Sequence, residues 1–203
     1  MIGDNERSEI EKTMRASPEH ARTAKAVYDA WPNIRDRVCQ EFLERLKSRI
    51  DPPPSVRIKI EDQTISMSKE AWPSVQPSSG KTAGRIAVCM APTGGRYSGW
   101  CFGVRWPVAR GALGPGGQKQ MDRIVETIES ELPGSKTLDS ERPVCRYLRG
   151  DGYKRFNDWG DLLPELMAEC GSPGEISRYF IEEFAKVSSV ALRAIDFVYG
   201  VER

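Results

Sequence analysis

A run of basic and aromatic residues between positions 142 and 155 carries the clearest chemical signal in the sequence. Five cations stand there against one acid, Asp151: Arg142, Arg146, Arg149, Lys154 and Arg155. Tyr147 and Tyr153 are interleaved with them. Arginine and aromatic side chains together bind phosphates and stack on bases, and they are equally common in protein interfaces. The run predicts a partner-binding strand and loop, with nucleic acid and protein both open, against the alternative of a solvated strand face.

Two further arginines occur earlier in the chain: Arg105 lies near the end of a predicted strand, and Arg110 lies in the loop that follows it. They extend the basic patch if the strand at 142–148 lies beside that earlier strand. We therefore include both among the candidate binding residues.

Nucleophilic and zinc chemistry lack their usual residues. The only histidine, His20, falls in the first turn of a predicted helix, so Ser-His-Asp and Cys-His mechanisms have no good general base. A zinc site would need carboxylate ligands, because the five cysteines show no CxxC spacing. We expect no catalytic residue of these classes, no metal site and no cofactor.

The glycine-rich segment 111–119 precedes a helix and superficially resembles a phosphate-binding loop. Its Lys119 is followed by Gln120 where a hydroxyl would hold magnesium, and the segment follows a hairpin instead of a parallel strand. We interpret it as a connector, although a helix N-terminus also attracts anions weakly.

The residues that must position this patch form a predicted hairpin at 85–107, with a turn at 91–95. On its second strand Trp100, Phe102 and Val104 share one face, and Gly99, Cys101 and Gly103 share the other. A fully buried large apolar side chain contributes roughly 1.5–3 kcal/mol, so the aromatic face predicts the centre of the core. The small face leaves room for another backbone to approach.

The remaining pattern predicts an α+β fold. A second hairpin spans 56–67, a loop is expected at 72–84, and a fifth strand spans 142–148. Helices are expected at 17–31, with Ser17 as cap and Pro18 at the first helical position, and at 33–50, about 118–132 and 161–170. The last helix is expected at 173–198, with Ser172 as its cap and Glu175 completing a capping box. Hairpins need no crossover, so we expect a mostly antiparallel sheet of about five strands with helices on one face and a long C-terminal helix. Pro32 is expected to end the first long helix, which divides the chain into a helical extension, 1–32, and a single domain, 33–203.

Composition favours an intracellular protein without membrane contact. The charged fraction is 29% and the net charge is +1, so no global charge recruits nucleic acid or a membrane. No run approaches the 18 or so apolar residues of a membrane span, and the N-terminus is polar. The odd, scattered cysteines favour a reducing compartment, and we expect a cytoplasmic location.

The order of elements resembles the accessory C-terminal portion of bacterial PD-(D/E)XK-family nucleases. The resemblance spans 33–199 and includes YSGWCFGVRW at 97–106, VCRYL at 144–148 and GYKRFNDW at 152–159. The family's catalytic pattern, an Asp followed on the next strand by Glu/Asp-x-Lys, is not matched, because Asp151-Gly-Tyr-Lys154 lacks a strand context and an acid partner. The resemblance implies a binding or regulatory module in phage defence or counter-defence.

The sequence thus favours a non-enzymatic binding module that holds a protein or nucleic acid through the 142–155 strand and loop. The alternative is a divergent divalent-metal-dependent nuclease or phosphodiesterase that uses Asp or Glu near the strand ends. A third possibility is a helix-mediated oligomer, in which Tyr28, Trp31 and the apolar stripe of 34–50 form a partner face instead of core.

Overall fold

The computed structural model describes residues 4–75, 84–94, 96–135, 137, 139, 142, 144–148 and 155–201. The chain forms two compact units, residues 1–38 and 39–203. Helix α2 contains the boundary between them.

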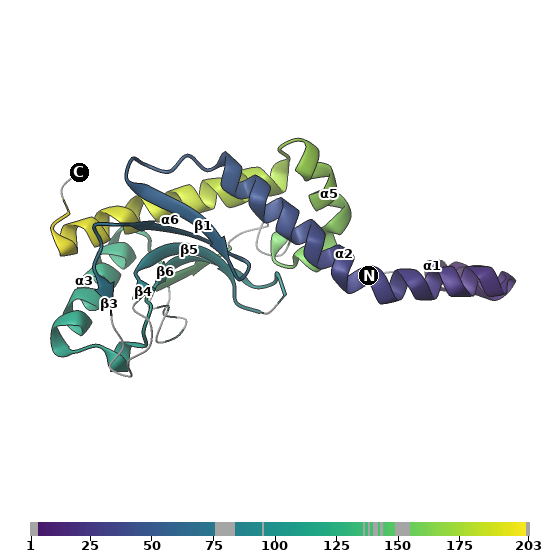
Figure 1. The fold of residues 1–203 in the computed structure, drawn as a ribbon, viewed down its shortest axis with the longest axis horizontal. Helices are drawn as coiled ribbons and strands as arrows, with labels where there is room; N and C mark the ends of the chain where they lie inside the picture. Colours follow the sequence, from purple (N-terminus) through teal and green to yellow (C-terminus); the bar gives the residue numbers. More distant parts are fainter. Residues whose placement is uncertain are drawn as a thin grey trace. The chain divides into compact units, whose positions relative to one another are not determined.

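The first unit is a helical hairpin. Helix α1 (Asp4–Ala16) folds back along the N-terminal part of α2 (Pro18–Arg49), with Ser17 between them (Figure 1). The backbone N–H of His20 donates to Ser17 Oγ at 3.1 Å, and Pro18 occupies the first helical position, so the predicted start signal is confirmed.

The predicted helix break at Pro32 is wrong, because α2 continues through it to Arg49. A proline inside a helix loses one backbone hydrogen bond and costs about 3 kcal/mol. The residues that follow recover this cost, because Phe42, Leu43 and Leu46 are fully buried in the second unit and hold that part of α2 helical.

The second unit contains a five-stranded antiparallel sheet in the order β1-β2-β5-β6-β7, and the predicted α+β fold is confirmed. The strands are β1 (Val56–Glu61), β2 (Thr64–Lys69), β5 (Ala87–Pro92), β6 (Trp100–Arg105) and β7 (Val144–Tyr147). A separate two-stranded sheet joins β3 (Ser74–Val75) to β4 (Gly84–Arg85), inside a segment expected to be a loop.

The long C-terminal helix α6 (Glu175–Tyr199) packs on one face of this sheet (Figure 1). Trp100 of β6 stacks on Trp159 at 4.0 Å between ring centroids and meets the edge of Phe180 at 5.5 Å. Phe102 contacts Phe180 and Phe184 of the same helix. The aromatic face of the 85–107 hairpin is therefore the centre of the core, as the alternation predicts.

The small face of β6 receives the neighbouring strand. A Cβ added to Gly103 would collide with the carbonyl oxygen of Val144, so only glycine lets β7 pair this closely at that position.

Helix α3 (Pro115–Glu131) contacts α6 and β7, and helix α5 (Leu163–Gly171) contacts α6. Short 3₁₀ helices, η1 (Arg110–Ala112) and η2 (Trp159–Leu162), precede them. Within the described residues, no helix combines the length and apolarity needed to cross a bilayer.

The N-terminus of α6 is capped differently from the prediction. We expected Ser172 to cap it, but the N-cap is Gly174, which has no side-chain cap of its own. The carboxylate of Glu169, from α5, accepts the backbone N–H groups of Ile176 and Ser177 at 2.9 and 2.7 Å. A Cβ at position 174 would collide with the Glu169 side chain, so glycine at this position allows the carboxylate to reach the N-terminus of α6.

A buried ion pair ties the sheet to the other end of α6. Lys69 Nζ of β2 donates to Asp196 Oδ2 at 2.6 Å, and Trp72 Nε1 donates to Asp196 Oδ1 at 2.8 Å. The Lys69 and Asp196 side chains are 11% and 12% exposed. Removing one partner of such a pair leaves an uncompensated buried charge.

Replacing Asp196 by Ala should therefore lower the free energy of unfolding by about 3 kcal/mol. The matched control is Glu131→Ala, which removes an exposed pair with Arg193 and should cost less than about 1 kcal/mol. Urea denaturation measures both, and an Asp196→Ala protein as stable as wild type would contradict the assigned role.

Candidate functional site

The face of the sheet turned away from α6 carries polar side chains in register. Because strand side chains alternate, Arg57 and Lys59 of β1 stand opposite Ser68 and Ser66 of β2, on the side that Met67 and Ile65 do not occupy. Ala87 of β5 and Arg105 of β6 are paired on the same side. We call the groove on this side the open sheet face. Among the residues that the structure describes, it is lined by Arg57, Lys59, Glu61, Ser66, Ser68, Gly84, Arg85, Ala87, Arg105 and Pro107, around a volume of about 540 Å³.

Arg85 reaches this groove because β4 ends beside the chain that leaves β6. A Cβ at Gly84 would collide with the ring of Pro107, so glycine at 84 permits this close approach. The register of β5 with β6 then places Arg105 at the same end of the sheet as Ala87. Two arginines from segments 20 residues apart thus line one groove.

The open sheet face has an excess of positive charge. Two of its four cations have acidic neighbours: Arg57 lies 2.7 Å from Glu70, and Lys59 lies 2.6 Å from Glu61. All four of those side chains are more than half exposed, so each pair is worth less than about 1 kcal/mol and yields easily to a ligand. Arg85 and Arg105 are exposed and form no ion pair with any residue that the structure describes.

The predicted binding residues of the fifth strand lie on two different faces. Arg146 is paired with Phe102 and points to the α6 side, where its Nε lies 3.8 Å from Glu183 Oε2 and its side chain is 19% exposed. Tyr147 is paired with Cys101 and lies on the other side of the sheet, the side of Arg105. Burial raises the pKa of Tyr147. Alternation along β7 therefore separates the two residues.

The remaining predicted arginines are dispersed and paired. Arg142 bonds Asp139 through Nε at 2.9 Å, Arg155 bonds Glu175 at 3.0 Å and lies over the Phe156 ring, and Arg110 lies 2.7 Å from Asp122. Three other candidates, Arg149, Tyr153 and Lys154, lie outside the described residues. Of the nine candidates, the groove itself contains Arg105.

Sequence reasoning missed Arg57, Lys59 and Arg85 as parts of this surface. The alternation of Arg57 and Lys59 with Ile58 and Ile60 does predict a half-exposed strand. The alternation does not predict the order of the strands. That order places β1 and β2 next to β5 and β6, so that Arg57 and Lys59 lie on the same face of the sheet as Arg105.

Three thiols lie on this same face of the sheet, on the neighbouring strands β5, β6 and β7. Cys89, Cys101 and Cys145 are buried and unoxidised, and Cys145 Sγ lies 3.0 Å from Cys101 Sγ. The hydrogen bond from Cys145 lowers the pKa of Cys101 and raises that of Cys145, while burial raises the pKa of Cys89 to about 12. Cys89 therefore stays a protonated, apolar packing group at neutral pH.

The shift at Cys89 predicts a loss of stability in alkali. Its pKa is 9.0 for a free thiol and rises to about 12 in the folded chain. The stability that this buried thiol contributes is therefore complete below pH 9 and disappears between pH 9 and 12, because the unfolded chain loses the proton first. The melting temperature should fall more steeply above pH 9 in wild type than in Cys89→Ala. Cys170→Ala, which removes a half-exposed thiol, is the control, and parallel profiles for wild type and Cys89→Ala would contradict this assignment.

No group of three or more His, Cys, Asp or Glu side chains in the described ranges is arranged to hold a metal ion. Comparison of the chain with protein-family models, with curated proteins and with solved structures gives no match.

Proposed function

We propose that the unit formed by residues 39–203 is a non-enzymatic module that binds nucleic acid through its phosphate backbone, across the open sheet face. The observation that carries this proposal is the pair of exposed arginines, Arg85 and Arg105, which line one groove without an acidic partner among the described residues. Guanidinium groups that no carboxylate neutralises are suited to bind phosphate oxygens.

The size of the groove suits a short stretch of backbone. Neighbouring strands lie about 4.8 Å apart, so the path from β1 across β2 and β5 to β6 is about 14 Å, or about four nucleotides at about 3.4 Å each. The half-buried Ser68 of β2 lies between the cations of β1 and Arg105, and its hydroxyl adds a hydrogen-bond donor.

The chemistry of the lining favours backbone contacts over base recognition. None of the described residues that line the groove is aromatic, whereas Trp72, Trp100, Trp106 and Trp159 are fully buried. Base stacking, which the interleaved tyrosines suggested, finds no aromatic ring among these described lining residues. Binding should therefore depend on charge and show little sequence preference.

The salt dependence of binding tests this electrostatic mechanism. If all four cations neutralise phosphates, affinity for a labelled single- or double-stranded oligonucleotide should fall about 50- to 150-fold between 50 and 200 mM salt. Fluorescence anisotropy measures it. Nucleic-acid affinity that does not change with salt would contradict a phosphate-binding mode.

Charge reversal tests the location. Arg85→Glu/Arg105→Glu should weaken binding at 50 mM salt by at least about 30-fold, because two contacts become repulsive. The matched control, Arg178→Glu/Arg193→Glu, makes the same charge change on exposed positions of α6 and should bind nearly as wild type. Absence of any binding by the wild-type protein, or an equal loss in both variants, would refute the proposed site; salt-insensitive capture of a protein instead would point to the other class of partner.

A further inference from the structure

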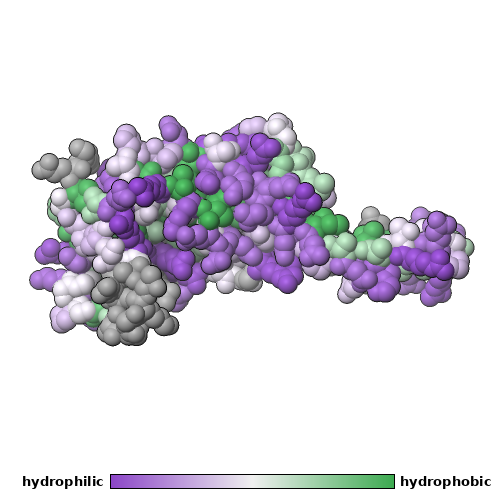
Figure 2. Space-filling model, viewed as in Figure 1, coloured by the Kyte–Doolittle hydropathy of each residue, from purple (hydrophilic) through white to green (hydrophobic). Residues whose placement is uncertain are grey.

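The helical hairpin of the first unit exposes an unusual number of large apolar side chains. Six of them are more than one-third exposed, and Tyr28 reaches 79%: Ile10 and Met14 on α1, and Val27, Tyr28, Trp31 and Ile34 on α2. We call this set the apolar helix face. Figure 2 shows hydrophobic residues at the surface of this helical pair, among hydrophilic ones.

These residues form one strip. Ile10 and Met14 line a hollow of about 370 Å³ together with Thr23 and Ala24 of α2. From Ala24 the strip continues along α2 through Val27, Trp31 and Ile34, at the spacing of three and four residues that keeps side chains on one side of a helix.

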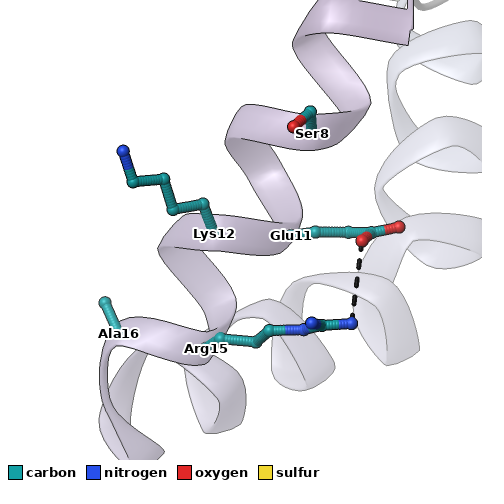
Figure 3. Close-up of a pocket in the computed structure, with 5 residues that line it drawn as sticks. All are labelled: Ser8, Glu11, Lys12, Arg15 and Ala16. Atoms are coloured by element: carbon teal, nitrogen blue, oxygen red, sulfur yellow. Dashed lines mark ion pairs between the residues drawn. The ribbon is translucent and has the colours of Figure 1, made fainter.

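The opposite side of α1 is polar, so the helix is amphipathic. Figure 3 shows Ser8, Glu11, Lys12 and Arg15 on α1, with Glu11 and Arg15 joined by an ion pair of 3.8 Å. Ile10 lies half a turn away from Ser8 and Lys12 in helical angle. The exposed apolar residues are therefore segregated on one side.

The hairpin has no core of its own. None of the described side chains from Ser8 to Arg37 is buried. Isolated helices of this length are marginal in water, and most of their stability comes from burying an amphipathic face. Farther along α2 the same stripe continues as Val38, Phe42 and Leu46, all of which are buried. The α2 residues of the apolar helix face thus continue the stripe that is buried farther along the helix, but they are themselves exposed to solvent.

We infer that the cover is a second copy of this chain, which docks its own hairpin on the apolar helix face to form a four-helix arrangement. A two-fold interface must be complementary to itself. Residues 4–38 satisfy this condition in charge, because they contain seven acidic and seven basic residues. Because the two signs are equal in number, two copies of this segment meet without net electrostatic repulsion.

The exposed area suits a dimer. If each of the six side chains buries about 100 Å², the face contributes about 600 Å² per copy, and the aliphatic parts of flanking Lys and Arg side chains bring it near the ~800 Å² per partner of a standard interface. The inference concerns the first unit and does not depend on the nucleic-acid proposal.

Sedimentation velocity and light scattering of the full chain, from about 1 to about 100 μM, test the inference. We expect a species of twice the 22.8 kDa chain mass, and Val27→Glu/Trp31→Glu should raise the dimer dissociation constant by at least about 100-fold. The matched control, Ala26→Glu/Asn33→Glu, adds the same two charges to exposed positions on the opposite side of α2 and should leave the dimer intact.

Wild-type protein that stays monomeric at about 100 μM would overturn the inference without reference to any variant. A dimer that persists in Val27→Glu/Trp31→Glu would place the interface elsewhere and overturn it as well. Circular dichroism and thermal melting verify that the variants retain the fold of the second unit.

Discussion

The packing of β6 against α6 is the constraint on which the rest of the structure depends. Trp100 and Phe102 must face Trp159, Phe180 and Phe184 to leave water, and this fixes the orientation of β6. Every other strand of the five-stranded sheet is paired to β6 directly or through β5, so its orientation is fixed in turn. One face of the sheet is closed by α6, and the polar residues of the other become the open sheet face.

That constraint decides which arginines are free to bind a ligand. Arg146 is opposite Phe102 and is therefore directed to the closed side, where Glu183 neutralises it. Arg105 stands one residue past Val104 and lies on the open side, with Arg57, Lys59 and Arg85 nearby. Whether an arginine occupies an even or an odd position in the strand alternation thus decides if it is structural, like Arg146, or a candidate ligand-binding residue, like Arg105.

The fold could be predicted from the sequence because its signals are local. Alternation in 86–106 and 56–60, helical spacing in 176–195 and the Ser17-Pro18 start are properties of neighbouring residues. The errors concern residues that tertiary contacts control. Pro32 does not end α2, because burial of Phe42 and Leu46 holds the helix beyond it, and Glu169 reaches the α6 N-terminus from another helix in place of Ser172. The groove was missed for the same reason, because only the order of the strands and the close packing of Gly84 against Pro107 bring Arg57, Arg85 and Arg105 to one groove.

The most direct test of the central claim is to map the binding surface by NMR. Backbone amide shifts of the ¹⁵N-labelled protein would be followed during titration with a short single-stranded oligonucleotide at low salt. The account predicts that the shifted amides belong to β1, β2, β4 and the end of β6, with those of α6 unchanged. Shifts centred on α6, shifts confined to 142–155, or a spectrum that does not change would contradict it.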